Sequence, residues 1–334
     1  MMRLNQPETS VQVLQRNGRS FHWAGRFLNG DQLANAASLY SLCRRIDDLA
    51  DEAVTPSQRA SAGEQLQELD RALAEGRPPA EALRPLYQQA CDLLAEEPMA
   101  VAALRDLIAT VQQDLGPVHL TDDAELLQYC YGVAGTVGVM MGCLLGAQPR
   151  ASALPHAIDL GIAMQMTNIA RDVLEDAQLG RVYLPAQGAA GSLDAAGLVA
   201  GDSQSRHQAW LGVRDLLARA ETRYTSAWRG LCYLPPRPRL AIAVAASLYR
   251  EIGRQILRRG EAVYWQRRSV VRPLRKIQVS LIAATRLLLA PAGDAAAGHD
   301  SRLHQGLVTC LDVNRQSSDT PMAGDLRSVG GYGE

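Results

Sequence analysis

The sequence predicts an all-α protein, because strand-forming signals are scarce and apolar residues recur at helical spacing. Only 5% of the 334 residues are aromatic, whereas β-strands favour aromatic and β-branched side chains. Long stretches rich in Ala, Leu, Arg and Glu place apolar residues three and four positions apart, the period of an amphipathic helix. With 47% hydrophobic residues, the chain can bury a large core. We expect one large helical domain over residues 1–290.

Proline and glycine residues separate the predicted helices along the chain. Residues 76–79 and 116–117 carry such breaks, and residues 121–125 supply a capping residue followed by acids, which is typical of a helix start. Helical periodicity covers residues 33–53, 57–75, 79–96, 98–115, 122–146, 152–178, 205–230, 237–266 and 273–290.

The composition changes from about residue 291, where Gly, Ser, Asp and other small residues begin to dominate. Such a segment has too few apolar residues to offset the entropy lost on ordering. We therefore expect residues 291–334 to form a disordered tail, with a short helix near 301–313 as its one ordered element.

Charge and cysteine content argue against several classes of protein. The formal net charge is only −1, so we expect no nucleic-acid partner. The six cysteines form no Cys-x-x-Cys pair, which predicts free thiols in a reducing compartment. The N-terminus lacks the apolar core of a secretion signal, and no uncharged apolar run reaches the ~18 residues that a membrane span needs. We expect a cytoplasmic protein.

One predicted helix, 152–178, carries a stripe of oxygen-bearing side chains. They recur three and four positions apart, so a helix places them on one face. Like charges at this spacing cost free energy, and carboxylate and amide oxygens are the ligands that hard divalent cations prefer. The stripe therefore predicts part of a metal site. Its members are Gln165, Asn168, Asp172 and Asp176.

A second acidic stripe lies about 120 residues upstream, where Asp47 and Asp51 share a helix face. The two stripes could meet across a cavity. A carboxylate-bridged di-iron bundle also uses acidic helices, but it needs Glu-x-x-His pairs, and none of the six histidines is placed that way. A non-catalytic helical scaffold would explain the helices but not the repulsive cost of the stripes.

Glycines interrupt another predicted helix at four-residue spacing. Gly138, Gly142 and Gly146 form one smooth ridge, although each glycine costs about 1 kcal/mol relative to alanine inside a helix. One explanation is close packing of two helices. The other is that the absent side chains leave room for a long apolar ligand.

Four sequence blocks occur in a fixed order. They are 40–51 (YSLCRRIDDLAD), 129–138 (YCYGVAGTVG), 168–176 (NIARDVLED) and 180–185 (GRVYLP). Together they resemble the squalene/phytoene synthase family of head-to-head prenyl transferases, over residues 15–290. The resemblance implies a helical fold of the isoprenoid synthase type, with a central apolar cavity. The pattern is most similar to that of bacterial phytoene synthases.

The resemblance also implies a role for each stripe. Asp47, Asp51, Asp172 and Asp176 would be the catalytic carboxylates, and with Asn168 they would hold Mg²⁺, with Mn²⁺ as a substitute. The metal withdraws charge from a diphosphate leaving group.

Further positions match the family's diphosphate-binding residues. Arg44 and Arg171 would grip phosphate oxygens; salt bridges to the neighbouring aspartates are the alternative. Ser20 matches the family's flexible flap on the phosphate side, although Gly18 and Arg19 depart from its usual Ser-Lys-Ser-Phe pattern.

Four other residues match with differing strength. Tyr40 and Gln165 match positions at the diphosphate end, and Tyr249 and Arg268 match weaker C-terminal positions. For Tyr249, a core ring with a satisfied hydroxyl is an equally good explanation.

The implied reaction condenses two geranylgeranyl diphosphates to phytoene through a cyclopropylcarbinyl diphosphate, without NADPH. A C30 enzyme making dehydrosqualene, presqualene diphosphate or squalene is the alternative. Residues 237–286 carry many arginines and only Glu251 and Glu261 as acids. These arginines form either a solvated basic face or a surface that contacts an anionic membrane. The second alternative would make the protein peripherally membrane-bound.

Overall fold

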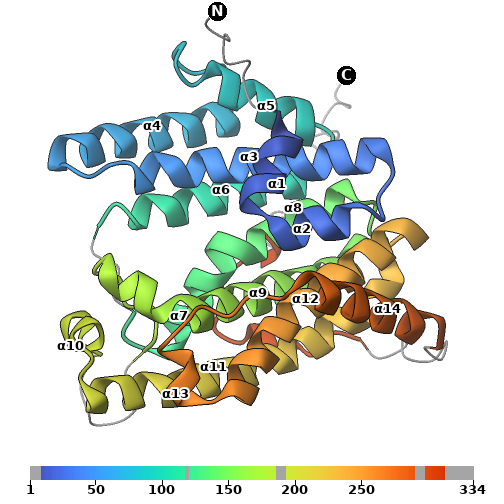
Figure 1. Cartoon of the computed structure of the whole chain (residues 1–334). Helices are drawn as coiled ribbons and strands as arrows, with labels where there is room; N and C mark the ends of the chain where they lie inside the picture. The colour runs from blue at the N-terminus through green and yellow to red at the C-terminus, as the bar shows by residue number, and fades with distance from the viewer. Residues whose placement is uncertain (1–8, 117–119, 186–192, 290–297, 313–334) are drawn as a thin grey trace, which may run out of the picture.

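The computed structural model describes residues 9–116, 120–185, 193–289 and 298–312 (Figure 1). Of the residues in these ranges, about 78% are helical and none forms a β-strand, which confirms the predicted all-α class. The first helices are α1 (Ser10–Asn17), α2 (Arg19–Gly25), α3 (Gly30–Asp51), α4 (Pro56–Glu75), α5 (Arg84–Leu94) and α6 (Pro98–Gln113).

A π-helical turn, η1, interrupts the next helical run. The remaining elements are α7 (Asp123–Cys130), η1 (Tyr131–Gly135), α8 (Thr136–Leu144), α9 (Arg150–Gln178), α10 (Ala195–Ala200), α11 (Ser203–Gly230), η3 (Leu231–Tyr233), α12 (Pro236–Arg259), α13 (Glu261–Tyr264), α14 (Pro273–Leu289) and η5 (Ser301–His304).

The helices stack in layers around the long central helix α9. Figure 1 shows α3, α4 and α6 above α9, with α11 below it, α12 beside it, and the short helices α1 and α2 across the front. Fully buried Leu42 and Ile46 of α3, Ile108 of α6 and Ile162 of α9 belong to one hydrophobic cluster. This core fixes α3 and α9, the two helices that carry the acidic stripes.

Most predicted helices begin and end within a few residues of the observed ones. The predicted helix 237–266 is divided at Gly260, whose φ of +73° ends α12 and is unfavourable for other residues. The apolar periodicity did not predict α1, α2 or α10, which are eight residues long or shorter. Helix α1 starts with a capping box between Thr9 and Gln12.

One helical run, Asp123–Leu144, is long and apolar enough to cross a bilayer by itself, and 56% of the apolar window is buried inside the protein. Core helices pass the same test of length and composition. The six cysteines, all of which lie within the described ranges, form no disulfide.

The structure describes residues 298–312 of the expected tail, and the short 3-10 helix η5 (Ser301–His304) lies within the predicted 301–313. Val308 exchanges two hydrogen bonds with the side chain of Gln128, at 3.0 and 3.1 Å. The backbone N–H of Cys310 donates to the hydroxyl of Tyr131 at 2.8 Å. Polar contacts to named partners, which composition does not reveal, thus order this segment. The rest of the predicted tail, 291–297 and 313–334, lies outside the described residues, as does residue 290.

Candidate active site

A cavity of about 1430 Å³ lies between α3, α8, α9 and α12. It exceeds the roughly 300–1,000 Å³ of typical small-molecule sites. One end is charged and includes Arg44, Asp47 and Arg171. The deeper wall is apolar and includes Val137, Met141, Leu160, Met164 and Ile252. Such a cavity suits a long apolar molecule with an anionic head.

Most of the predicted site residues line this cavity, although they come from four separate helices and a loop. Three predicted carboxylates, Asp51, Asp172 and Asp176, are not among the lining residues. Those that line it are Ser20, Tyr40, Arg44, Asp47, Gln165, Asn168, Arg171, Tyr249 and Arg268.

Helix α3 carries the first acidic stripe. An Asn29–Gln32 capping box starts this helix, and the spacing of three and four residues places Arg44, Asp47 and Asp51 on one face. Arg44 pairs with Asp48 at 2.5 Å and approaches Asp51 at 3.8 Å. Burial, with the nearby charges of Asp51 and Asp48, raises the pKa of Asp47 to about 7. The stripe thus concentrates negative charge where a cation would be stabilised.

Helix α9 carries the second stripe. The Asn168 side-chain amide donates to Gln165 at 3.3 Å, but its Oδ1 atom is buried without a hydrogen-bond partner among the described residues. An unsatisfied buried oxygen costs about 1–3 kcal/mol. A cation at this point would satisfy it.

Two arginines hold Asp172 on this stripe. Arg268 donates to both carboxylate oxygens at 2.7 and 2.8 Å, and Arg171 donates to Oδ1 at 2.7 Å. Burial alone would raise the pKa of Asp172, but these hydrogen bonds hold that pKa below its ordinary value. Burial and the charge of Asp172 raise the pKa of Asp176 to about 7. Arg268, one of the two weaker C-terminal matches in the sequence, therefore lies beside the second acidic stripe.

Arg181 links the two stripes, a role that the sequence did not reveal. Its Nη2 atom donates to Asp51 Oδ1 at 3.0 Å, and its backbone N–H donates to the carbonyl of Asp176 at 2.9 Å. The signal that could have found it is its place in the block 180–185, directly after α9.

Asp114 is a second residue that sequence reasoning missed. Burial raises its pKa to about 6, although the charge of Arg181 opposes this, and Tyr129 donates to its Oδ2 atom at 3.3 Å. The charge of Asp114 also helps raise the pKa of Asp47. No local spacing predicts this proximity, because it depends on how α6 packs on α3.

The donor set fits a hard divalent cation. Crowded carboxylates and one unsatisfied amide oxygen are the ligands that Mg²⁺ prefers, and metal binding favours their deprotonated forms. Asp47, Asp51, Asn168, Asp172 and Asp176 supply these groups.

The predicted flap lies at the junction of α1 and α2. The two helices meet at Gly18, where an added Cβ would lie 2.9 Å from Leu14 Cδ1. The centroid of the Phe21 ring lies 5.1 Å from the ring centroid of Tyr249 and 6.3 Å from that of Tyr40. The segment is thus helical, and it closes one side of the charged end of the cavity.

The glycine ridge is explained by helix packing at its most crowded position. A Cβ on Gly138 would lie 2.2 Å from the backbone oxygen of Ala157 on α9, closer than any real contact of this kind. A Cβ on Gly142 would lie 3.2 Å from Cδ2 of Leu154. Gly146 lies beyond the end of α8 and has a φ of +74°. Gly138 also lines the cavity, but backbone contact already requires glycine there.

A comparison with protein families matches residues 14–275 to the squalene/phytoene synthase family. The chain is 34% identical to a 15-cis-phytoene synthase from Enterobacter agglomerans over 269 residues, which cover 78% of this chain and 89% of the relative. It is 35% identical to a 15-cis-phytoene synthase from a Paracoccus strain, with 78% and 84% coverage.

Solved structures show the same architecture. A dehydrosqualene synthase in complex with a ligand superposes with a TM-score of 0.66 at 27% identity, covering 84% of this chain and 96% of that one. A squalene synthase from Alicyclobacillus acidocaldarius gives a TM-score of 0.58 at 22% identity, with 75% and 94% coverage. The second likeness supports the fold alone.

Proposed function

The chain belongs to the squalene/phytoene synthase family, and on this premise we propose that it condenses two geranylgeranyl diphosphates head to head into phytoene. Two diphosphates and two protons leave, so no reductant such as NADPH is required. The observation that carries the proposal is the cavity of about 1430 Å³, whose lining combines charged side chains with an apolar wall. Its similarity to relatives named 15-cis-phytoene synthase supports a C20 substrate over a C15 substrate for this chain.

The chain's own residues have distinct tasks in this reaction. Bound Mg²⁺, or Mn²⁺ in its place, would neutralise charge on the departing diphosphate. Arg44, Arg171 and Arg268 now pair with carboxylates. In the substrate complex they would donate to phosphate oxygens through their forked guanidinium groups. Ser20 and Tyr40 would close the charged end over the diphosphate.

The apolar wall would protect the reacting carbons. While the C2=C3 double bond of one substrate attacks C1 of the other, Val137, Met141 and Leu160 would exclude water that traps cations. Proton loss then gives the cyclopropylcarbinyl diphosphate, and a second ionisation in the same cavity, followed by rearrangement and proton loss, gives phytoene.

Product analysis tests this function directly. We expect the purified protein with Mg²⁺ to convert geranylgeranyl diphosphate to phytoene, with or without NADPH. Farnesyl diphosphate is the matched C15 substrate. A C30 product formed faster than phytoene would reassign the chain length, and an NADPH-dependent product would indicate squalene. No Mg²⁺-dependent diphosphate release from either substrate would favour a non-catalytic scaffold.

Helix α14 supports peripheral contact with an anionic membrane. Leu274, Leu281 and Leu288 recur every seven residues and are 77%, 64% and 85% exposed. Arg272, which lies beside them and lines the cavity, is also exposed. Full burial of a leucine side chain contributes about 1.5–3 kcal/mol, and each basic residue near anionic lipid about 1 kcal/mol. The helix would thus place the cavity beside the lipid that dissolves its substrates.

Vesicle sedimentation tests the membrane contact. At low salt we expect binding to phosphatidylglycerol-containing vesicles and little binding to phosphatidylcholine alone. The triple variant Leu274→Gln, Leu281→Gln, Leu288→Gln should weaken binding by about tenfold or more, since it removes several kcal/mol of burial. A matched control replaces two exposed apolar residues elsewhere with glutamine: Val54, between α3 and α4, and Leu211 of α11. Equal binding by both variants would refute the role of α14.

A further inference from the structure

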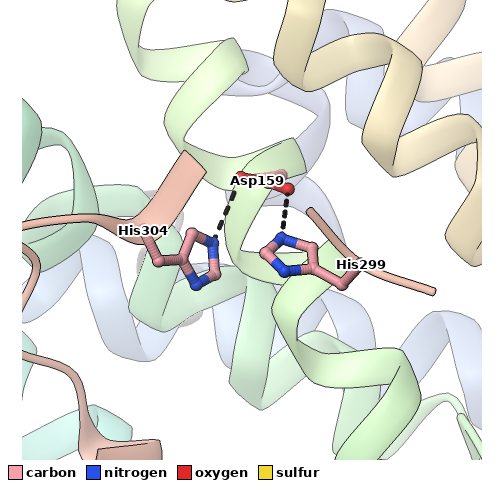
Figure 2. Close-up of side chains that lie close together, drawn as sticks. All are labelled: Asp159, His299 and His304. Atoms are coloured by element: carbon pink, nitrogen blue, oxygen red, sulfur yellow. Dashed lines mark hydrogen bonds and ion pairs between the residues drawn. The ribbon is translucent and has the colours of Figure 1, made fainter. Parts of the chain in front are cut away.

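Three polar side chains form a compact group beside the part of α9 that precedes the acidic stripe. Figure 2 shows Asp159 on α9, flanked by His299 and His304 of the C-terminal segment. One ligand atom from each lies within 4.8 Å of the other two. Asp159 precedes Gln165, the first member of the stripe, by six residues, roughly 9 Å along the helix. The group is therefore separate from the acidic stripe.

Both histidines point the same ring nitrogen at the buried carboxylate. His299 Nε2 lies 2.8 Å from Asp159 Oδ2, and His304 Nε2 lies 3.2 Å from Oδ1. The two rings are 4.4 Å apart between centroids, and Asp159 has no exposed surface. Two imidazoles and one carboxylate are ligands typical of zinc.

A second layer of hydrogen bonds holds the carboxylate in place. The Ser226 hydroxyl lies 2.5 Å from Asp159 Oδ2, and His156 Nδ1 lies 2.8 Å from the Ser226 oxygen. An ionised carboxylate only accepts hydrogen bonds, so Ser226 donates to Asp159 and His156 donates to Ser226. Metal-binding carboxylates are commonly oriented by such partners.

One buried donor beside the group has no partner. Arg223 is only 7% exposed. Its Nε atom lies 4.0 Å from Asp159 Oδ1 and has no hydrogen-bond partner among the described residues. The other end of its guanidinium donates to the carbonyl of Leu303 at 2.8 Å, in the same C-terminal segment. The unpaired N–H suits an additional oxygen ligand close to the carboxylate.

We propose that Asp159, His299 and His304 bind one zinc ion, which fastens residues 298–312 to α9. A water or hydroxide would complete the tetrahedral coordination and accept the hydrogen bond of Arg223 Nε. Zinc displaces the proton from each Nε2 atom, so both histidines bind as neutral imidazoles. Mg²⁺ prefers oxygen ligands, so the two metal sites of the chain would select different ions.

Zinc titration in excess Mg²⁺ tests the proposal, because Mg²⁺ then occupies the acidic stripes. We expect one zinc per full-length chain, measured by competition with a chromophoric chelator. His299→Gln and His304→Gln should each weaken binding by on the order of 100-fold. His207→Gln is the matched control, since His207 is exposed and pairs with Glu261, which is not a member of the group. Undiminished affinity in both ligand variants would overturn the assignment.

Two further measurements keep the test independent of the variants' folding. The zinc X-ray absorption spectrum of the wild type should show two imidazoles with oxygen ligands; sulfur ligands or an oxygen-only shell would overturn the proposal. Zinc should also slow alkylation of Cys310, which is buried within the fastened segment, relative to Cys130 in the main core. Equal Cys310 alkylation with and without zinc would show that the ion does not fasten the segment.

Discussion

Asp47→Asn is expected to abolish diphosphate release while leaving the protein at least as stable as the wild type. No hydrogen bond or ion pair joins Asp47 to another described residue, and burial, together with the charges of Asp51, Asp114 and Asp48, disfavours its ionised form more than the charge of Arg44 favours it. Removing its charge should therefore change the free energy of unfolding by between zero and about +1 kcal/mol. The isosteric amide leaves the packing of α3 intact.

The activity of Asp47→Asn should fall, although its stability should not. Loss of one group that stabilises charge in a transition state typically costs about 10²–10³ in rate, and loss of a metal ligand should cost at least as much. Single-turnover release of diphosphate from geranylgeranyl diphosphate at saturating Mg²⁺ measures this loss. Wild-type turnover in Asp47→Asn would refute the assignment of Asp47 as a ligand.

The effect of Mg²⁺ on thermal stability distinguishes a loss of metal binding from a loss of folding in Asp47→Asn. A ligand that binds only the folded state raises its stability, so Mg²⁺ should raise the thermal midpoint of the wild type more than that of Asp47→Asn. Asp31→Asn is the matched control, since Asp31 lies exposed in the first turn of the same helix. It should keep both the activity and the response to Mg²⁺.

The sequence predicted the parts of the site that depend on one helix alone. Asn168, Asp172 and Asp176 share a face because the helical period requires it. The same period grouped Asp47 and Asp51 on α3.

Residues brought together by packing between elements escaped prediction. Asp114 reaches the α3 stripe only because α6 packs beside α3, and Arg181 joins the stripes only where the chain leaves α9. His299 and His304 looked like part of a polar tail. Their partner Asp159 is 140 residues away in sequence from the first of them, and no local pattern records such a pairing.

The glycine ridge shows a different limit of prediction from sequence. The spacing of the glycines placed them correctly on one helix face, but it allowed two explanations for them. The structure decides between them by a distance: the position of a Cβ on Gly138, 2.2 Å from the oxygen of Ala157. The facing helix repeats the arrangement, since a Cβ on Gly161 would lie 2.0 Å from the oxygen of Ala134. Two backbones in contact leave no room for a methyl group on either side.

Gly138→Ala should therefore destabilise the protein by about 3 kcal/mol, since α8 and α9 must separate to admit the methyl group. Urea unfolding measures this loss, and Gly63→Ala is the matched control. Gly63 lies inside α4, where an added Cβ would make only an ordinary 3.5 Å contact with Leu115. The control should gain up to about 1 kcal/mol from helix propensity. If Gly138→Ala instead unfolds like the wild type but loses turnover of the C20 substrate, room for the ligand, and not helix packing, explains the ridge.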